Sequence, residues 1–360
     1  MPVNNDFAIY INDKKIGIDT PTYIIAEISA NHCGSLDKAI EMIRKAKMAG
    51  ADAVKLQTYT ADTITLNCNK SDFILPTDNP WEAHNTLHAL YSKAYTPWEW
   101  HETLFDEAKS VGIDIFSSPF DSTAVDLLEA LNTPVYKIAS PEITDIALLA
   151  QVAQTKKPVI LSTGIAEYED IVLAVDTLRE NGCEHLVILK CTTAYPTPFE
   201  ECNLMTIPDI SRKFKCLSGL SDHTRGIVVP VASVALGARV VEKHFVLDKS
   251  DESVDAFFSL DYAEFYEMVN SIRQCEKALG QVNYAITGSA QKNLLAKRSL
   301  YFCRDIAAGQ VIKRGDIRSV RPGFGAHPKY LEQYIGKMMS KSMTMGDRVL
   351  PDVIVGSIED

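Results

Sequence analysis

Two histidines stand at the ends of two consecutive strand-like runs, where their side chains could bind a metal ion. His223 ends the apolar run 216–223, and His244 lies near the end of the run 240–246. Residues 227–236 between them are apolar, rich in alanine and closed by a glycine, which is typical of a helix. In a strand–helix–strand unit with parallel strands, the carboxyl ends of both strands lie on the same rim of the sheet. We therefore expect the two imidazoles to be neighbours.

Neutral imidazole is a common ligand of divalent transition metals, and two histidines with a carboxylate make up part of a coordination shell. The pair His223 and His244 therefore predicts a metal site. The alternative is that each histidine only hydrogen-bonds a loop, which is the commoner role of a single histidine. Their matching positions at two strand ends favour the metal site.

The elements that must position these histidines repeat regularly. Strand-like runs alternate with amphipathic helical patterns, several of which end at Gly or Asn. The runs are residues 23–29, 53–58, 114–119, 135–140, 158–163, 186–192, 216–223 and 240–246. Eight β/α repeats in about 260 residues match a closed (β/α)8 TIM barrel, an α/β fold, whereas an open doubly wound sheet usually has fewer strands.

Changes of pattern along the chain predict four parts. The expected boundaries are residues 1–22 for an N-terminal hairpin, 23–280 for the barrel, 281–295 for a polar linker and 296–360 for a small C-terminal domain. Within the barrel, the long insertion 61–96 overlies the exit of the second strand and could be a substrate loop or a lid. In the small domain, runs 299–303 and 349–355 have a β-like pattern.

Composition excludes several classes of partner. Apolar residues make up 46% and charged residues 23%, as in ordinary globular proteins. A formal net charge of -11 argues against extensive contact with nucleic acid or an anionic membrane. Without a membrane span or an export signal, we expect a cytoplasmic protein. The eight cysteines form no C-x-x-C pair, which argues against disulfides and structural zinc.

Barrel enzymes carry out chemistry at the carboxyl ends of their strands. Side chains at these ends are Glu27, Lys55, Gln57, Ser117, Ser118, Lys137, Ser140, Glu142, Lys190, Thr192, Thr193, Tyr195, Ser221, Asp222, His223, Glu242, Lys243 and His244. Lysines inside apolar strands are costly unless they pair with an anion, so Lys55 and Lys137 predict a phosphate or carboxylate pocket. One alternative is a structural ion pair with Glu27 or Glu142. Another is Schiff-base chemistry, which a bound metal would make redundant.

Six segments then carry a resemblance to a known family. They are residues 25–32 (IAEISANH), 50–58 (GADAVKLQT), 136–140 (YKIAS), 161–164 (LSTG), 219–224 (GLSDHT) and 242–245 (EKHF). Together they resemble the sialic acid synthase family, whose members condense phosphoenolpyruvate with an acylated amino sugar to form a nine-carbon 2-keto acid. The resemblance covers nearly the whole chain, and the C-terminal domain is similar to that family's antifreeze-like (SAF) domain.

Four further segments most resemble the pseudaminic acid synthase branch of this family. They are residues 94–101, 116–121, 255–260 and 321–329. The branch implies condensation of phosphoenolpyruvate with 2,4-diacetamido-2,4,6-trideoxy-altrose to pseudaminic acid and phosphate. The alternatives are a legionaminic or N-acetylneuraminic acid synthase and, from another class, a non-catalytic sugar-binding relative. The presence of Glu27, Lys55, Lys137, His223 and His244 argues against the non-catalytic alternative.

The resemblance also implies roles for individual residues. His223 and His244 would hold a Mn²⁺ or Mg²⁺ ion that polarises the sugar aldehyde, and Glu27 would transfer a proton. Lys55 and Lys137 would hold phosphoenolpyruvate. Phosphoenolpyruvate is also expected to contact Ser118, Ser140, Thr193 and Ser221. Asp255 is expected to contact the sugar. Substrate binding is further expected of Gln57, Glu142 and Tyr195.

Arg321 is similar to the arginine that the family's SAF domain delivers into the barrel mouth of the partner subunit, which implies a domain-exchanged homodimer. The alternative for Arg321 is a surface charge beside a turn. Two positions depart from the family pattern: Cys33 stands where asparagine is common, and Val254 stands where proline is usual. Both are expected in loops near the sugar, so the resemblance indicates the reaction more firmly than the sugar.

Overall fold

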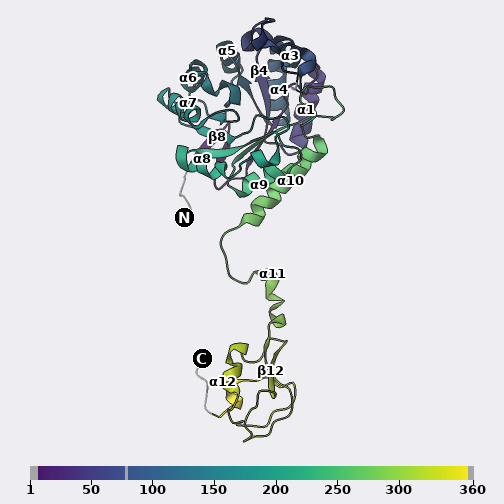
Figure 1. The fold of residues 1–360 in the computed structure, drawn as a ribbon, viewed down its shortest axis with the longest axis vertical. Coiled ribbons are helices and arrows are strands. Elements are labelled where there is room, and N and C mark those ends of the chain that lie inside the picture. Colours follow the sequence, from purple (N-terminus) through teal and green to yellow (C-terminus); the bar gives the residue numbers. More distant parts are fainter. Residues whose placement is uncertain (1–6, 78–79, 356–360) are drawn as a thin grey trace. The chain divides into compact units, whose positions relative to one another are not determined.

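The computed structural model of the protein describes residues 7–77 and 80–355. The chain forms two compact units that divide between Gly280 and Gln281 (Figure 1). In the first unit, eight parallel strands close into a barrel in the order β10-β3-β4-β5-β6-β7-β8-β9. The predicted TIM barrel is therefore confirmed.

Each of the eight predicted runs contains one barrel strand. The strands are β3 (Tyr23–Glu27), β4 (Ala53–Thr58), β5 (Asp114–Pro119), β6 (Tyr136–Ile138), β7 (Val159–Ser162), β8 (Leu186–Lys190), β9 (Leu217–Asp222) and β10 (Val240–His244). Glu27 is the register partner of His244 on one side and of Lys55 on the other. The closed barrel thus places a histidine, a carboxylate and a lysine in one row near its rim.

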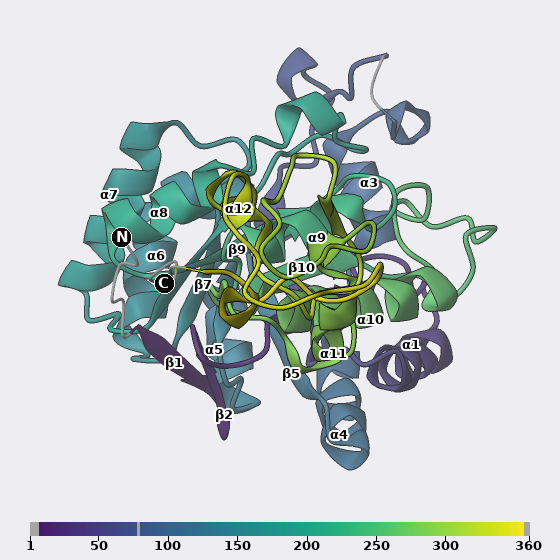
Figure 2. The same ribbon diagram turned by 90° about the horizontal axis from the view of Figure 1, so that it is seen from below.

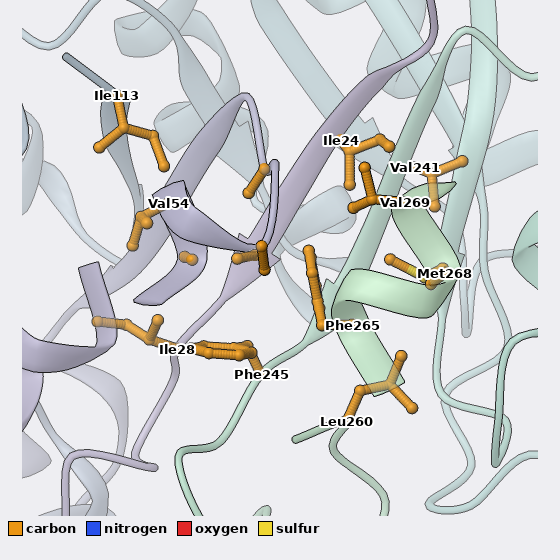
Figure 3. Packing of buried hydrophobic residues seen from close by; sticks show 14 of the residues in the cluster. Ile24, Ile28, Val54, Ile113, Val241, Phe245, Leu260, Phe265, Met268 and Val269 are labelled. Atoms are coloured by element: carbon orange, nitrogen blue, oxygen red, sulfur yellow. The ribbon is translucent and has the colours of Figure 1, made fainter. Parts of the chain in front are cut away.

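Helices surround the strands. They are α1 (Leu36–Met48), α4 (His101–Val111), α5 (Ser122–Ala130), α6 (Ile146–Gln154), α7 (Tyr168–Glu180), α8 (Thr206–Phe214), α9 (Val228–Ala235) and α10 (Tyr262–Leu279). Figure 3 shows the packing of α10 on the barrel, where Phe265 lies 5.4 Å from Phe245, centroid to centroid. Among the described residues, no helix combines the length and the apolar character that a membrane span requires.

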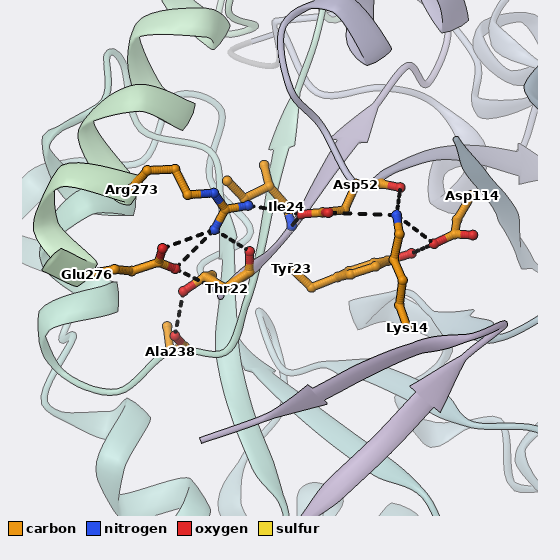
Figure 4. Close-up of polar contacts among 9 residues, drawn as sticks. All are labelled: Lys14, Thr22, Tyr23, Ile24, Asp52, Asp114, Ala238, Arg273 and Glu276. Carbon is orange, nitrogen blue, oxygen red and sulfur yellow. Dashed lines mark hydrogen bonds and ion pairs between the residues drawn. The ribbon is translucent and has the colours of Figure 1, made fainter. Parts of the chain in front are cut away.

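An N-terminal hairpin, whose two strands are labelled in Figure 2, packs at the end of the barrel where the barrel strands begin. It consists of β1 (Ala8–Ile11) and β2 (Lys14–Gly17), and its Ile9, Ile11 and Ile16 pack with apolar side chains of the barrel interior. The ammonium of Lys14 lies 3.7 Å from a carboxylate oxygen of Asp52 and 3.2 Å from one of Asp114, as Figure 4 shows. Because the hairpin occupies this end, the opposite rim is where a site can open.

The insertion between β4 and α4 has short helices of its own. They are α2 (Ala61–Ile64), η1 (Ser71–Phe73), η2 (Glu82–His84), α3 (Leu87–Ala94) and η3 (Trp98–Trp100). A β-bridge between Ile74 and Thr86 joins its two halves. Thr86 also caps α3, because its hydroxyl accepts a hydrogen bond from the backbone N–H of Ala89 at 3.2 Å. The insertion is thus a folded segment with its own hydrogen bonds.

The second unit is small and rich in loops. Its elements are α11 (Gly288–Gln291), η6 (Leu294–Ala296), β11 (Ser299–Phe302), β12 (Ile317–Val320), η7 (Pro328–Tyr330), α12 (Leu331–Tyr334) and η8 (Pro351–Val353). The β-like run predicted at 299–303 forms β11, but the strand predicted at 349–355 is wrong. Residues 351–353 form η8 instead, because Pro351 lacks the N–H that a ladder position needs and fits the first turn of a helix, and Ile354 then makes an isolated β-bridge with Met339.

Candidate active site

A cavity of about 330 Å³ opens at the rim formed by the carboxyl ends of the strands. The predicted site residues that line it are Lys55, Gln57, Lys137, Ser140, Thr193, Tyr195, Ser221, His223, His244 and Asp255. Glu27 and Ser118 lie beside this lining and contact Lys55. The structure therefore brings together side chains from β3, β4, β5, β6, β9 and β10 and from the loops after β6, β8, β9 and β10.

The two histidine rings lie 5.4 Å apart, centroid to centroid. Nδ1 of His223 is 2.9 Å from the carbonyl oxygen of Thr192, so this nitrogen donates a proton and Nε2 remains available as a ligand. Nδ1 of His244 is buried without a hydrogen-bond partner among the described residues. Burial holds the pKa of His244 well below its usual value, so this imidazole is neutral.

These features fit a metal ion held by two imidazoles. Both rings sit on one rim, and His244 has the neutral form and the unsatisfied buried nitrogen that a ligand needs. Within residues 7–77 and 80–355, no group of three or more His, Cys, Asp or Glu side chains is arranged to hold an ion. The chain itself therefore offers two ligands here, and substrate or water would have to supply the others.

Two buried lysines face two buried carboxylates on the cavity floor. The ammonium of Lys55 lies 2.9 Å from Glu27 and 3.4 Å from Glu242, oxygen to nitrogen. The ammonium of Lys137 lies 3.8 Å from Glu242 and donates to the hydroxyl of Ser162 at 2.7 Å. The ion pair considered for Lys55 and Glu27 is thus present, whereas the carboxylate beside Lys137 is Glu242.

Burial shifts two of these groups towards neutral pH. It raises the pKa of Glu27 to about 7, against the opposing charge of Lys55, and the charge of Glu242 adds to the increase. Burial also lowers the pKa of Lys137 to about 8. A carboxyl group with this pKa can give or take a proton near pH 7. When Glu27 is protonated, two ammonium groups face the single charge of Glu242, which leaves one positive charge for an anionic ligand.

The remaining predicted side chains hold fixed positions around this floor. The amide of Gln57 donates to Glu27 at 3.0 Å, and the hydroxyl of Ser221 donates to Glu242 at 3.0 Å. The hydroxyl of Ser140 accepts from the backbone N–H of Gly164 at 2.8 Å. A Cβ on Gly164 would lie 2.1 Å from the hydroxyl oxygen of Thr193, so only glycine leaves room for these hydroxyls.

Two predicted residues are not among the residues that line the cavity. Glu142 is half-buried, and burial raises the pKa of this carboxyl to about 7. Arg321 belongs to the second unit, where its side chain is exposed. The lining thus covers most, but not all, of the side chains expected to contact substrate.

Glu242 is the central residue to which the sequence analysis assigned no role. It lies two positions before His244, and alternate side chains of a strand point to the same side, so both enter the barrel. Lys243 points the other way, and its ammonium lies 2.5 Å from the buried carboxylate of Asp222. The alternation of side chains along the strand could therefore have indicated Glu242 as a site residue, because His244 is expected at the rim two positions later.

Replacing Lys243 with methionine is expected to lower the free energy of unfolding by about 3–5 kcal/mol, because it leaves the buried charge of Asp222 unpaired. Urea unfolding followed by circular dichroism measures this change. Lys249, which is half-exposed and pairs with Glu264, is the matched control, and its change to methionine should cost less than about 1 kcal/mol. Equal losses in the two variants would contradict the structural role of Lys243.

The insertion and the loop after β10 meet over the cavity. The indole N–H of Trp81 donates to the carbonyl oxygen of Val254 at 2.7 Å. The Trp81 ring lies 5.4 Å from that of Tyr195, and the hydroxyl of Ser29 contacts the carboxylate of Asp255. Of the two departures from the family pattern, Val254 therefore lines the cavity, whereas Cys33 is exposed.

Comparison with known proteins extends these observations. Residues 42–284 match the NeuB family, and residues 297–355 match the SAF domain, which confirms the predicted C-terminal domain. The pseudaminic acid synthase of Campylobacter jejuni is 46% identical over 91% of this chain and 95% of its own. The N,N'-diacetyllegionaminic acid synthase of the same species is 37% identical over 89% of this chain and 96% of its own.

A solved structure of a related enzyme has a similar fold. The N-acetylneuraminic acid synthetase of Leptospira borgpetersenii superposes with a TM-score of 0.69 at 29% identity, covering 80% of this chain and 95% of that one. The family match spans most of the barrel, and the relatives match at nearly full length. The chain therefore belongs to the NeuB, or sialic acid synthase, family of phosphoenolpyruvate-dependent nonulosonic acid synthases.

Proposed function

We propose that this protein condenses phosphoenolpyruvate with 2,4-diacetamido-2,4,6-trideoxy-altrose to give pseudaminic acid and phosphate. The observation that carries the proposal is the shared cavity, which combines two buried lysines with two histidines on one barrel rim. The choice of sugar is supported by the higher identity to a pseudaminic acid synthase, 46%, than to a legionaminic acid synthase, 37%.

In the proposed reaction, Lys55 and Lys137 hold the phosphate and carboxylate of phosphoenolpyruvate. Carbon 3 of phosphoenolpyruvate attacks the aldehyde carbon of the open-chain sugar, and Glu27 gives a proton to the aldehyde oxygen. Water adds at carbon 2, and the tetrahedral intermediate expels phosphate by cleavage of the C–O bond. A Mn²⁺ or Mg²⁺ ion bound by His223 and His244 would supply Lewis-acid polarisation of the aldehyde.

The resemblance also supports a domain-exchanged homodimer, in which Arg321 of one chain completes the barrel site of the other. A homodimer with two-fold symmetry allows each subunit to contribute the same residue to its partner. A guanidinium group adds a fixed, bidentate donor for a carboxylate or phosphate. The expected assembly therefore has two composite sites.

Phosphate release tests the proposed function. The protein is incubated with phosphoenolpyruvate, manganese and one of three sugars: the 2,4-diacetamido altrose, the corresponding precursor of legionaminic acid, or N-acetylmannosamine. Release that is fastest with the altrose sugar is the expected result. A clear preference for either of the other sugars would replace the proposal by the legionaminic or N-acetylneuraminic alternative, and no release with any sugar would favour a non-catalytic relative.

Alkaline pH is expected to weaken capture of phosphoenolpyruvate. Burial lowers the pKa of Lys137 to about 8, so its ammonium is present below this pH and is lost above it. If the charge is required, kcat/KM for phosphoenolpyruvate falls about tenfold per pH unit above the pKa. A profile of kcat/KM against pH measures the position of this falling limb.

Changing Glu242 to glutamine tests whether Lys137 is the group whose titration causes the falling limb. The charge of Glu242 raises the pKa of Lys137 against the effect of burial, so its removal should move the falling limb to lower pH by about one unit or more. Glu184, which is exposed at the start of β8, is the control, and its change to glutamine should leave the limb in place. A limb that stays near pH 8 in the Glu242→Gln variant would mean that another group titrates.

A further inference from the structure

One helix of the insertion turns its apolar face to the cavity. In α3, Leu87, Leu90, Tyr91 and Ala94 all line the cavity. Their spacing of i, i+3, i+4 and i+7 is that of a single helix face. Leu75, from the preceding part of the insertion, lines it as well. The contribution of the insertion to the cavity is thus mainly hydrocarbon.

This face does not take part in the hydrophobic core. Leu75, Leu87 and Leu90 belong to none of the four clusters of packed apolar side chains that the described residues form. Leu75 and Leu90 are each 7% exposed, so most of each side chain is covered by protein and a small part borders the cavity, whereas Leu87 is half-buried. An apolar helix face normally packs against a core, so a face that borders a cavity is available to an apolar part of a ligand.

Trp81 completes this wall and connects it to the loop after β10. The Trp81 ring packs against Tyr195 and Phe257, at centroid distances of 5.4 Å and 6.5 Å. Its N–H donates to the carbonyl of Val254, the neighbour of Asp255, which is the expected sugar contact. The cavity therefore has a charged floor built by the strands and an apolar wall of Leu75, Trp81, Leu87 and Leu90.

We propose that this apolar wall is the specificity-determining element that binds the end of the sugar remote from the aldehyde and selects 6-deoxy over 6-hydroxy sugars. The inference rests on the proposed function, because it names the part of the sugar that the same site recognises. The floor takes the anionic groups, so the acetamido group at carbon 4 and the methyl group at carbon 6 are left for the wall. A 6-hydroxyl placed against leucine side chains loses its hydrogen bonds to water without replacement.

The test compares matched pairs of sugars that differ only in the 6-deoxy or 6-hydroxy group. The wild-type protein should favour the 6-deoxy member by about 10- to 100-fold in kcat/KM. The variants Leu87→Asn and Leu90→Asn should lower this ratio by about tenfold, while KM for phosphoenolpyruvate changes less than about twofold. Leu66→Asn is the control, because Leu66 belongs to the same insertion but is 64% exposed and lies outside the lining.

The possible failures are distinguishable. If the protein releases phosphate but its 6-deoxy preference is absent in the wild type, or is unchanged in both asparagine variants, the role of the wall is wrong while the proposed reaction stands. If the preferred sugar has another stereochemistry, the proposed substrate is wrong, and the 6-deoxy and 6-hydroxy pair of that series still tests the wall. Leu90→Met, which keeps the apolar surface, should retain the wild-type ratio, and a tenfold loss there would also overturn the inference.

Discussion

Changing His244 to alanine is expected to lower kcat/KM for phosphate release by about a thousandfold or more. Its imidazole is buried, neutral and without a hydrogen bond at Nδ1 among the described residues, where a carboxylate oxygen of Asp255 lies 3.8 Å away, and it stands beside His223 on the cavity rim. If His244 is one of two protein ligands of the metal, as proposed, its loss would remove Lewis-acid activation of the aldehyde, which contributes several kcal/mol, and each ~1.4 kcal/mol is a factor of ten. Phosphate release and manganese titration by calorimetry are the two measurements.

His185 is the matched control for this experiment. It is exposed at the start of β8, on the rim opposite the cavity, so the His185→Ala variant should keep wild-type activity and manganese affinity. A His244→Ala variant that binds manganese as tightly as the wild type would contradict the assignment of His244 as a ligand. Calorimetry makes this conclusion independent of turnover.

If Arg321 completes the site of the partner subunit as proposed, its guanidinium would make a charge-assisted hydrogen bond to substrate worth ~1.5–3 kcal/mol, so the Arg321→Ala variant is expected to lose about a hundredfold in kcat/KM. The His223→Ala variant is expected to be inactive because it lacks a proposed metal ligand. When the two variants are mixed, activity should return. Random exchange gives mixed dimers with one complete site, so about a quarter of wild-type activity is expected. The measurement is phosphate release after the two variants have been incubated together.

The control for complementation is Arg314→Ala. Arg314 lies in the same unit, is 72% exposed and pairs with Glu332, so its removal should not affect activity. If the mixture of Arg321→Ala and His223→Ala stays inactive although its subunits exchange, the composite site is wrong. Full activity of Arg321→Ala alone would instead identify Arg321 as the surface charge considered in the sequence analysis.

The parts of the fold predictable from the sequence were those determined by local pattern. Apolar runs of strand length separated by amphipathic helices indicated all eight strands, and parallel strands then required His223 and His244 to share a rim. The strand expected at 349–355, which the structure does not contain, was also inferred from local pattern. The valine and isoleucine of this run indicate a strand, but Pro351 cannot donate a hydrogen bond to a ladder and begins η8.

The site was less predictable because it depends on which side chains meet across the barrel. Lys55 faces Glu27 through the pairing of β3 with β4, and Lys137 faces Glu242 across the interior. No pattern along the chain gives these distances. Likewise, the apolar spacing in α3 indicates a buried helix face, but only the fold shows that a cavity rather than a core covers it.

Product analysis tests the central claim most directly. Metal-stripped protein is incubated with phosphoenolpyruvate and 2,4-diacetamido-2,4,6-trideoxy-altrose, with and without manganese, and the mixture is analysed by mass spectrometry and phosphate assay. The predicted result is a nine-carbon 2-keto acid formed in equal amount with phosphate, and only when manganese is present. Phosphate without that acid, or equal product in the metal-free reaction, would contradict the account.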